Sequence, residues 1–278
     1  MEDREAQRVL DALEAFAAAG DTPAAERRAF LAGVRVGIEL ERESARDGVR
    51  HTLWRLADPR PWVEAFAEVP TAYVADGHHR SASAWRAAAE LRTGDFPASS
   101  GEFEWFPGVL FPAGELRILP YNRIVRDLGG QRAAAVLDRL GGVGRLAETL
   151  EPTPPGPGAF CLYLSGCWRR LELDPASIDA GDPIRSLDVS LLHERVLAPI
   201  LGIGDQRTDP RIDFVGGIRG VAELARRVDA GEAALAVSMY PTTVQQLMAA
   251  ADAGQVMPPK TTWFEPKLAS GLLVHPFT

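Results

Sequence analysis

The stretch "YVADGHHRSASAWRAA" at residues 73–88 joins a short apolar run to an alanine-rich segment with helical spacing. We interpret residues 71–75 as a strand and residues 81–92 as a helix. The polar residues between these two segments are Asp76, Gly77, His78, His79 and Arg80. The pattern therefore predicts a strand–helix corner that concentrates five chemically useful residues.

A corner of this kind is suited to binding an anion, because the first N–H groups of a helix lack intrahelical partners and face its positive dipole end. Gly77 permits a tight turn or a close backbone approach, and Arg80 supplies a fork of donors for phosphate oxygens. Asp76 could accept a proton from a hydroxyl or hold magnesium. His78 and His79 could donate to phosphoryl oxygens or shuttle protons. In the structural alternative, Asp76 only caps the helix and one histidine packs in the core.

The composition is that of an ordinary soluble globular protein, with 278 residues, 46% hydrophobic and 24% charged. The formal net charge of −8 argues against non-specific binding to nucleic acid, which needs a basic surface. The sequence contains no apolar run of membrane-spanning length and begins with a charged segment, so we expect a cytoplasmic protein without a membrane partner. Cys161 and Cys167 are six positions apart in a strand-like pattern, which predicts free, buried thiols rather than a disulfide.

The two lysines of the chain fall in one segment, "MPPKTTWFEPKL" at residues 257–268, although the sequence has 30 basic residues. A lysine differs from an arginine where a compact ammonium is needed. We therefore take Lys260 and Lys267 as candidates for phosphate binding, with hydroxyl groups from Thr261 and Thr262 beside them. The alternative is a rigid, proline-stiffened loop that its aromatic residues pin to the core.

The rest of the chain predicts an α+β fold, a mixed sheet with packed helices. A hairpin is expected from 33–42 and 47–56, and another from 160–173. Helices are expected at 60–69, 131–139, 143–150, 187–201 (capped by Asp188 or Ser190), 220–231 and 242–254. Strands are expected at 103–112, 115–125, 211–217, 233–241 and 270–277. The glycines of "DFVGGIRG" are interpreted as tight-turn residues, because the spacing fits no nucleotide-binding motif.

Proline and glycine crowd the segment "PTPPGPGAF" at residues 152–160, which predicts a loop or a boundary. We divide the chain into a divergent N-terminal segment at 1–45, a core with the DGHHR corner at 46–151, and a C-terminal α/β portion at 152–278. The last two are expected to pack as one globular unit.

Several motifs together resemble the DUF1015 family. They are "ADGHHR" followed by a helix, "DGVRHTLWRL", "LDVSLLHERVLAPILGI", "DFVGG" and "MPPKTTWFEPKLASGLLVHP". The resemblance covers roughly residues 45–278 and identifies relatives rather than a reaction. Members of that family carry a long segment before the part that is matched here, so the N-terminal part of the family is expected to be missing.

The DGHHR corner is also similar to the phosphate-binding box of the ParB/sulfiredoxin superfamily, which includes free-serine kinases. That similarity implies a ParB/sulfiredoxin-like core around the corner. It also implies Asp76 as catalytic or magnesium-holding acid, with Gly77, His78, His79 and Arg80 as a phosphate cradle. A second, upstream acid acts as base in those kinases, and the candidates here are Glu39 and Glu41, for which a solvated strand edge is the alternative.

The sequence and the resemblance together favour a phosphotransferase that uses ATP or ADP, with CTP as a third candidate, and Mg²⁺. Its substrate would be a small hydroxyl-bearing metabolite, serine-like by analogy. One alternative is a nucleotide-binding switch without metabolite chemistry, and another is an inactive relative. The oligomeric state stays open, with a homo-oligomer among the alternatives.

Overall fold

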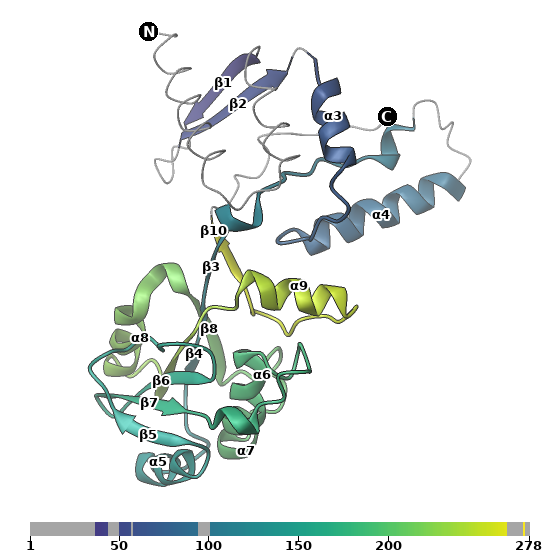
Figure 1. Cartoon of the computed structure of the whole chain (residues 1–278). Coiled ribbons are helices and arrows are strands. Elements are labelled where there is room, and N and C mark those ends of the chain that lie inside the picture. The colour runs from purple at the N-terminus through teal and green to yellow at the C-terminus, as the bar shows by residue number, and fades with distance from the viewer. Residues whose placement is uncertain (1–36, 44–49, 57, 94–100, 266–274, 276–278) are drawn as a thin grey trace. The chain divides into compact units, whose positions relative to one another are not determined.

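The computed structural model describes residues 37–43, 50–56, 58–93, 101–265 and 275 of the chain (Figure 1). The chain divides into two compact units, residues 1–74 and 75–278, and each is described by itself. Within the described residues, no helix is both long enough and apolar enough to cross a bilayer. The three-part division expected from the sequence stays a prediction.

The first unit contains the hairpin predicted from the sequence. Strand β1 (Gly37–Glu43) pairs antiparallel with β2 (Arg50–Leu56). Helix α3 (Arg60–Ala67) follows with a proline in its first turn, where the missing N–H costs nothing. The Trp62 and Phe66 rings, four residues apart on this helix, stack with centroids 6.3 Å apart.

The second unit is built on a six-stranded sheet with the strand order β5-β7-β6-β9-β4-β8. Its neighbouring strands pair antiparallel. The strands are β4 (Tyr121–Val125), β5 (Arg145–Glu148), β6 (Ala159–Leu164), β7 (Cys167–Glu172), β8 (Ile212–Gly216) and β9 (Leu235–Met239). A separate two-stranded ladder joins β3 (Arg117–Leu119) to β10 (Trp263–Glu265).

Helices follow or connect these strands. They are α4 (His78–Thr93), α5 (Ala133–Gly141), α6 (Asp188–Leu192), a π-helical turn (His193–Leu197), α7 (Ala198–Leu201), α8 (Gly220–Asp229) and α9 (Val244–Asp252). Helices and an antiparallel sheet in one unit confirm the predicted α+β class.

The central strand β6 is buried along its whole length, and its side chains alternate between two cores. Phe160, Leu162 and Leu164 face the larger core, which α5, α6 and α7 cover. Tyr163 faces the smaller core, to which α8 contributes Leu224. Figure 1 shows α8 and α5–α7 around the same sheet. Each fully buried leucine stabilises the fold by roughly 1.5–3 kcal/mol.

Three predicted elements are wrong, and one predicted helix begins earlier than expected. Residues 71–75 are not in a strand, and residues 105–112 contain neither a helix nor a strand. Residues 145–148 form strand β5 instead of a helix, because they pair with the edge of β7 and this tertiary pairing overrides local helix propensity. Helix α4 begins at His78 rather than after Arg80. The strand expected at 270–277 falls almost wholly outside the described residues.

The proline-rich segment is a loop. Residues 149–158 connect β5 to β6 within the sheet. Asp188 and Ser190 were the predicted N-caps of the helix at 187–201, but the N-cap of α6 is Leu187. The carboxylate of Asp188 instead accepts a hydrogen bond from the Gly158 N–H at 2.8 Å and so ties the end of this loop to the helix.

Candidate functional site

The corner singled out by the sequence is the first turn of α4. The Ser81 N–H donates to the Gly77 carbonyl at 2.9 Å, which closes the first helical turn. His78, His79 and Arg80 are therefore the first three helical residues, and their backbone N–H groups have no intrahelical acceptor. Gly77 has φ of +87°, a left-handed conformation that glycine adopts without strain.

Two side chains fold back onto this turn. The Asp76 Oδ1 accepts a hydrogen bond from the Gly77 N–H at 2.7 Å, which holds its carboxylate beside the helix start. The Arg80 guanidinium lies over Gly77, so that a Cβ at position 77 would be 3.3 Å from Arg80 Nη2. The corner thus places one carboxylate and one guanidinium at the positive end of a 16-residue helix.

The corner is open to solvent. Asp76, His78, His79 and Arg80 are exposed, and Gly77 is half-buried. Exposed histidines in the first turn contradict the alternative in which one of them packs in the core. Three backbone donors and a guanidinium on one accessible turn can bind an anion such as phosphate.

The C-terminal candidates lie elsewhere in the second unit. Lys260 is exposed and has φ of +57°, and its Nζ lies 5.5 Å from the centroid of the Tyr121 ring. Thr261 is buried, and its hydroxyl donates to the Pro258 carbonyl at 2.5 Å, so this proton is already committed to the loop. Thr262 is half-buried.

The three remaining candidates are Lys267, Glu39 and Glu41. Lys267 lies outside the described residues. Glu39 and Glu41 are in strand β1 of the first unit, at the register positions opposite Trp54 and Thr52. Among the described residues, no group of three or more His, Cys, Asp and Glu side chains is placed to hold a metal ion.

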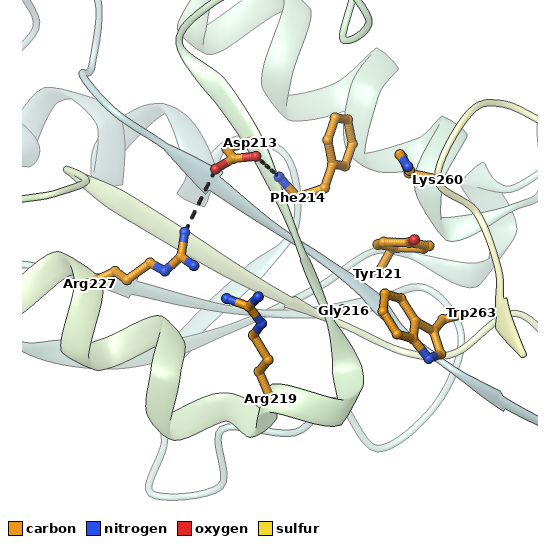
Figure 2. Close-up of a pocket in the computed structure, with 8 residues that line it drawn as sticks. All are labelled: Tyr121, Asp213, Phe214, Gly216, Arg219, Arg227, Lys260 and Trp263. Atoms are coloured by element: carbon orange, nitrogen blue, oxygen red, sulfur yellow. Dashed lines mark hydrogen bonds and ion pairs between the residues drawn. The ribbon is translucent and has the colours of Figure 1, made fainter. Parts of the chain in front are cut away.

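The structure also contains a pocket of about 380 Å³ that the sequence did not predict (Figure 2). It lies at the outer edge of the six-stranded sheet, where β8 is the last strand. Among the predicted site residues that the structure describes, only Lys260 lines this pocket, and no residue of the DGHHR corner does. The lining residues are Tyr121, Asp213, Phe214, Gly216, Arg219, Arg227, Lys260 and Trp263.

Gly216 allows the wall of this pocket to form. In the β4–β8 ladder Gly216 is the partner of Tyr121, and the Trp263 ring packs directly onto it. A Cβ at Gly216 would be 2.5 Å from the ring. Gly217 is similarly crowded, since its Cβ would be 2.7 Å from Pro120. The signal in the sequence was the paired glycines of "DFVGG", although their spacing by itself predicted only tight-turn residues.

Neither cysteine is paired in the structure, as predicted, but of the two only Cys161 is buried, whereas Cys167 is half-buried. Burial raises the pKa of the Cys161 thiol to about 11 and is also the main cause that raises the pKa of Cys167. A thiol with a raised pKa is a poor nucleophile near neutral pH. These residues therefore carry no chemistry at the candidate sites.

The chain is similar to several solved structures and also matches one family model. A free serine kinase in complex with AMP has 16% sequence identity and a TM-score of 0.35, with 68% of this chain and 66% of that chain covered. A variant of that kinase with ADP has 18% identity, a TM-score of 0.34 and the same coverage. A conserved hypothetical protein from Pyrococcus furiosus has 16% identity and a TM-score of 0.34, with 68% of each chain covered. The aligned part spans just under two thirds of the kinase chains, and TM-scores of this size carry no argument about activity.

No curated protein matches the sequence. A family model does match, at residues 24–190, and its description is "Protein of unknown function (DUF1015)". This match begins upstream of residue 45, where the resemblance was expected to start, and it includes the corner at Asp76–Arg80. Because it covers 167 of 278 residues, more than half of the sequence, the chain belongs to the DUF1015 family.

Proposed function

We propose that the protein is a nucleotide-dependent phosphotransferase whose phosphate cradle is the corner from Asp76 to Arg80. The observation that carries this proposal is the meeting of three helical N–H groups that have no intrahelical acceptor and the Arg80 guanidinium on one exposed turn. Both kinds of donor favour phosphate oxygens, and the helix dipole adds roughly half a positive charge at the same place.

Asp76, the acid of the corner, would act on the hydroxyl group that accepts the phosphate. Asp76 is held beside the cradle by the Gly77 N–H, so its carboxylate would orient the attacking hydroxyl or accept its proton. His78 and His79 lie in the same turn and would donate to phosphoryl oxygens. Catalysis would then rest mainly on positioning and on stabilisation of charge.

Magnesium fits this arrangement. The ion is usually held by one or two carboxylates together with substrate phosphates, and Asp76 supplies one such carboxylate. When bound, the ion would neutralise charge on the phosphoryl group that is transferred. Serine is the first acceptor to test, because the DGHHR corner is similar in sequence to the phosphate-binding box of free-serine kinases.

The test is incubation of the protein with Mg²⁺, each of ATP, ADP and CTP, and a panel of hydroxyl-bearing amino acids. Phosphorylated products are detected by ³¹P NMR and mass spectrometry. Asp76→Asn keeps an acceptor for the Gly77 N–H, so we expect kcat to fall at least about 100-fold while nucleotide binding persists. Arg80→Gln is expected to raise KM for the nucleotide.

The matched control is Arg86→Gln. Arg86 is exposed on the same helix, and its guanidinium donates to Ser83 rather than to the corner. This variant is expected to behave as the wild type. Nucleotide binding at the corner without any phosphorylated product would contradict the phosphotransferase and leave the nucleotide-binding switch. Equal activity in wild type and Asp76→Asn would contradict the role of the acid.

A further inference from the structure

The pocket at the sheet edge has two chemically different ends. Figure 2 shows the rings of Tyr121, Phe214 and Trp263 grouped with Lys260 on one side, and Asp213 with two arginines on the other. The Tyr121 and Trp263 rings meet edge to face, with centroids 5.3 Å apart and planes inclined by 64°. This geometry leaves a firm aromatic wall against which a planar group can pack.

The aromatic wall is held in place by contacts outside the pocket. The Trp263 Nε1 donates to Glu265 at 2.6 Å, and Gly216 leaves room for the ring to pack against the sheet. The buried side chain of Arg123 lies 4.9 Å from the Phe214 ring centroid. The rings are therefore positioned before any ligand arrives, which lowers the cost of binding.

Two cations of the pocket, Arg219 at the charged end and Lys260 at the aromatic end, have no recorded carboxylate partner among the described residues. Arg227 already contacts acids, since its Nε donates to Glu223 at 2.7 Å and its Nη1 lies 3.7 Å from Asp213. For the exposed Arg219, the structure records no carboxylate partner within the part of the chain that it describes. Lys260 likewise has no recorded carboxylate partner among the described residues, and its recorded contact is with the Tyr121 ring. Two cations thus face the pocket without matching acids.

Lys260 also adopts a conformation that its side chain disfavours. Its φ of +57° lies in the left-handed region, where a non-glycine residue is uncommon and usually marks strain or function. The Thr261 hydroxyl anchors the loop to the Pro258 carbonyl, and the Thr242 hydroxyl donates to the Thr261 carbonyl at 3.4 Å. The loop therefore holds the ammonium over the aromatic wall.

We propose that this pocket binds a small phosphomonoester that carries a planar ring, at a site separate from the DGHHR corner. The ring packs against Tyr121 and Trp263 beside the Lys260 ammonium, and the phosphate meets Arg219 at the charged end. A phosphomonoester carries nearly two negative charges at pH 7, which matches the two unpaired cations. A pocket of about 380 Å³ lies within the range of known small-molecule sites. The proposal stands without the phosphotransferase.

AMP is the first probe, because it joins a flat heterocycle to a phosphate. Isothermal titration of the full chain is expected to show one AMP site that persists in Arg80→Gln, a variant that weakens the corner. Adenosine lacks the phosphate and ribose 5-phosphate lacks the planar heterocycle, so each is expected to bind at least about tenfold more weakly than AMP. Binding is also expected to weaken with added salt, because Arg219 and Lys260 are exposed.

Two variants assign the site. Arg219→Gln and Lys260→Gln each remove one exposed cation, and each is expected to weaken AMP binding about tenfold or more in the Arg80→Gln background. The control is Arg132→Gln, since Arg132 is an exposed arginine at the start of α5 that does not line the pocket. It is expected to bind AMP like its parent.

Three outcomes would overturn the proposal. They are no AMP binding up to millimolar concentration, equal binding by the two pocket variants and the control, and loss of AMP binding in Arg80→Gln alone. The last result would assign AMP to the corner. The phosphotransferase proposal fails by a different result, the absence of a phosphorylated product. The two proposals can therefore fail independently.

Discussion

Replacement of Gly216 by alanine tests whether the Trp263 ring is packed as closely as the structure shows. The added Cβ would lie 2.5 and 2.6 Å from two ring carbons, whereas ordinary contacts begin at 3.4 Å. The ring would therefore have to retreat by about 1 Å (3.4 − 2.5 Å). Its Nε1 is bonded to Glu265 and its edge meets Tyr121, so this movement would disturb both contacts.

The effect is steric, because Gly216 has φ of −60° and ψ of 137°, which alanine adopts readily. Overpacking of this kind costs about 1–3 kcal/mol. We therefore expect the free energy of unfolding to fall by that amount in urea titrations followed by circular dichroism. For a unit of this size, each kcal/mol corresponds to about 2–4 °C in Tm.

The matched control is Gly204→Ala, since a Cβ at Gly204 would meet no atom within 4 Å. In a double-mutant cycle, Trp263→Ala removes the obstructing ring, so the added cost of Gly216→Ala should fall below about 0.5 kcal/mol in that background. Equal unfolding midpoints for Gly216→Ala and Gly204→Ala would refute the close packing of Trp263 on the sheet.

Three further predictions concern the fold. Burial raises the pKa of Asp188 to about 6, above the value of 3.8 expected in the unfolded chain, so the folded state retains a proton that the unfolded state loses. The unfolding free energy of the wild type should therefore fall by about 2 kcal/mol between pH 4 and pH 6, relative to Asp188→Asn in parallel denaturant titrations; parallel curves would contradict this. Ser165 has φ of +53° before Gly166 in the two-residue β6–β7 turn, so Ser165→Asn should stabilise the protein by about 0.5–1 kcal/mol in the same assay, and a loss of stability would count against it. The Cys161 thiol should react with a disulfide reagent only when urea unfolds the chain, and rapid labelling of the native protein would show that its burial is wrong.

Local signals were sufficient for several elements of the fold. The strand-like alternation at 160–173 predicted the β6–β7 hairpin, whose two-residue turn suits glycine. The helix at 242–254 is confirmed as α9, where Thr243 and Gln246 form a reciprocal capping box and Gly254 follows the helix end with φ of +65°. Such signals act between residues a few positions apart, so the sequence displays them directly.

The corner illustrates how far such local information reaches. The order Asp76-Gly77-His78-His79-Arg80 predicted a helix that starts after Arg80, and the structure begins this helix three residues earlier, at His78. The strand expected before it is absent, because an apolar run of five residues does not determine whether a partner strand is available. The role of the corner in phosphate binding stays a proposal.

The sequence by itself determined the α+β class, most helices and hairpins, the free cysteines and the start of α4 near Asp76. Only the tertiary structure decided that residues 145–148 are an edge strand and that Tyr121, Gly216 and Trp263 form one wall of a pocket. These three residues are far apart in the chain, and strand register and ring packing bring them together. Alternation along a strand shows which side chains share a face, but it does not identify the strand that lies beside it.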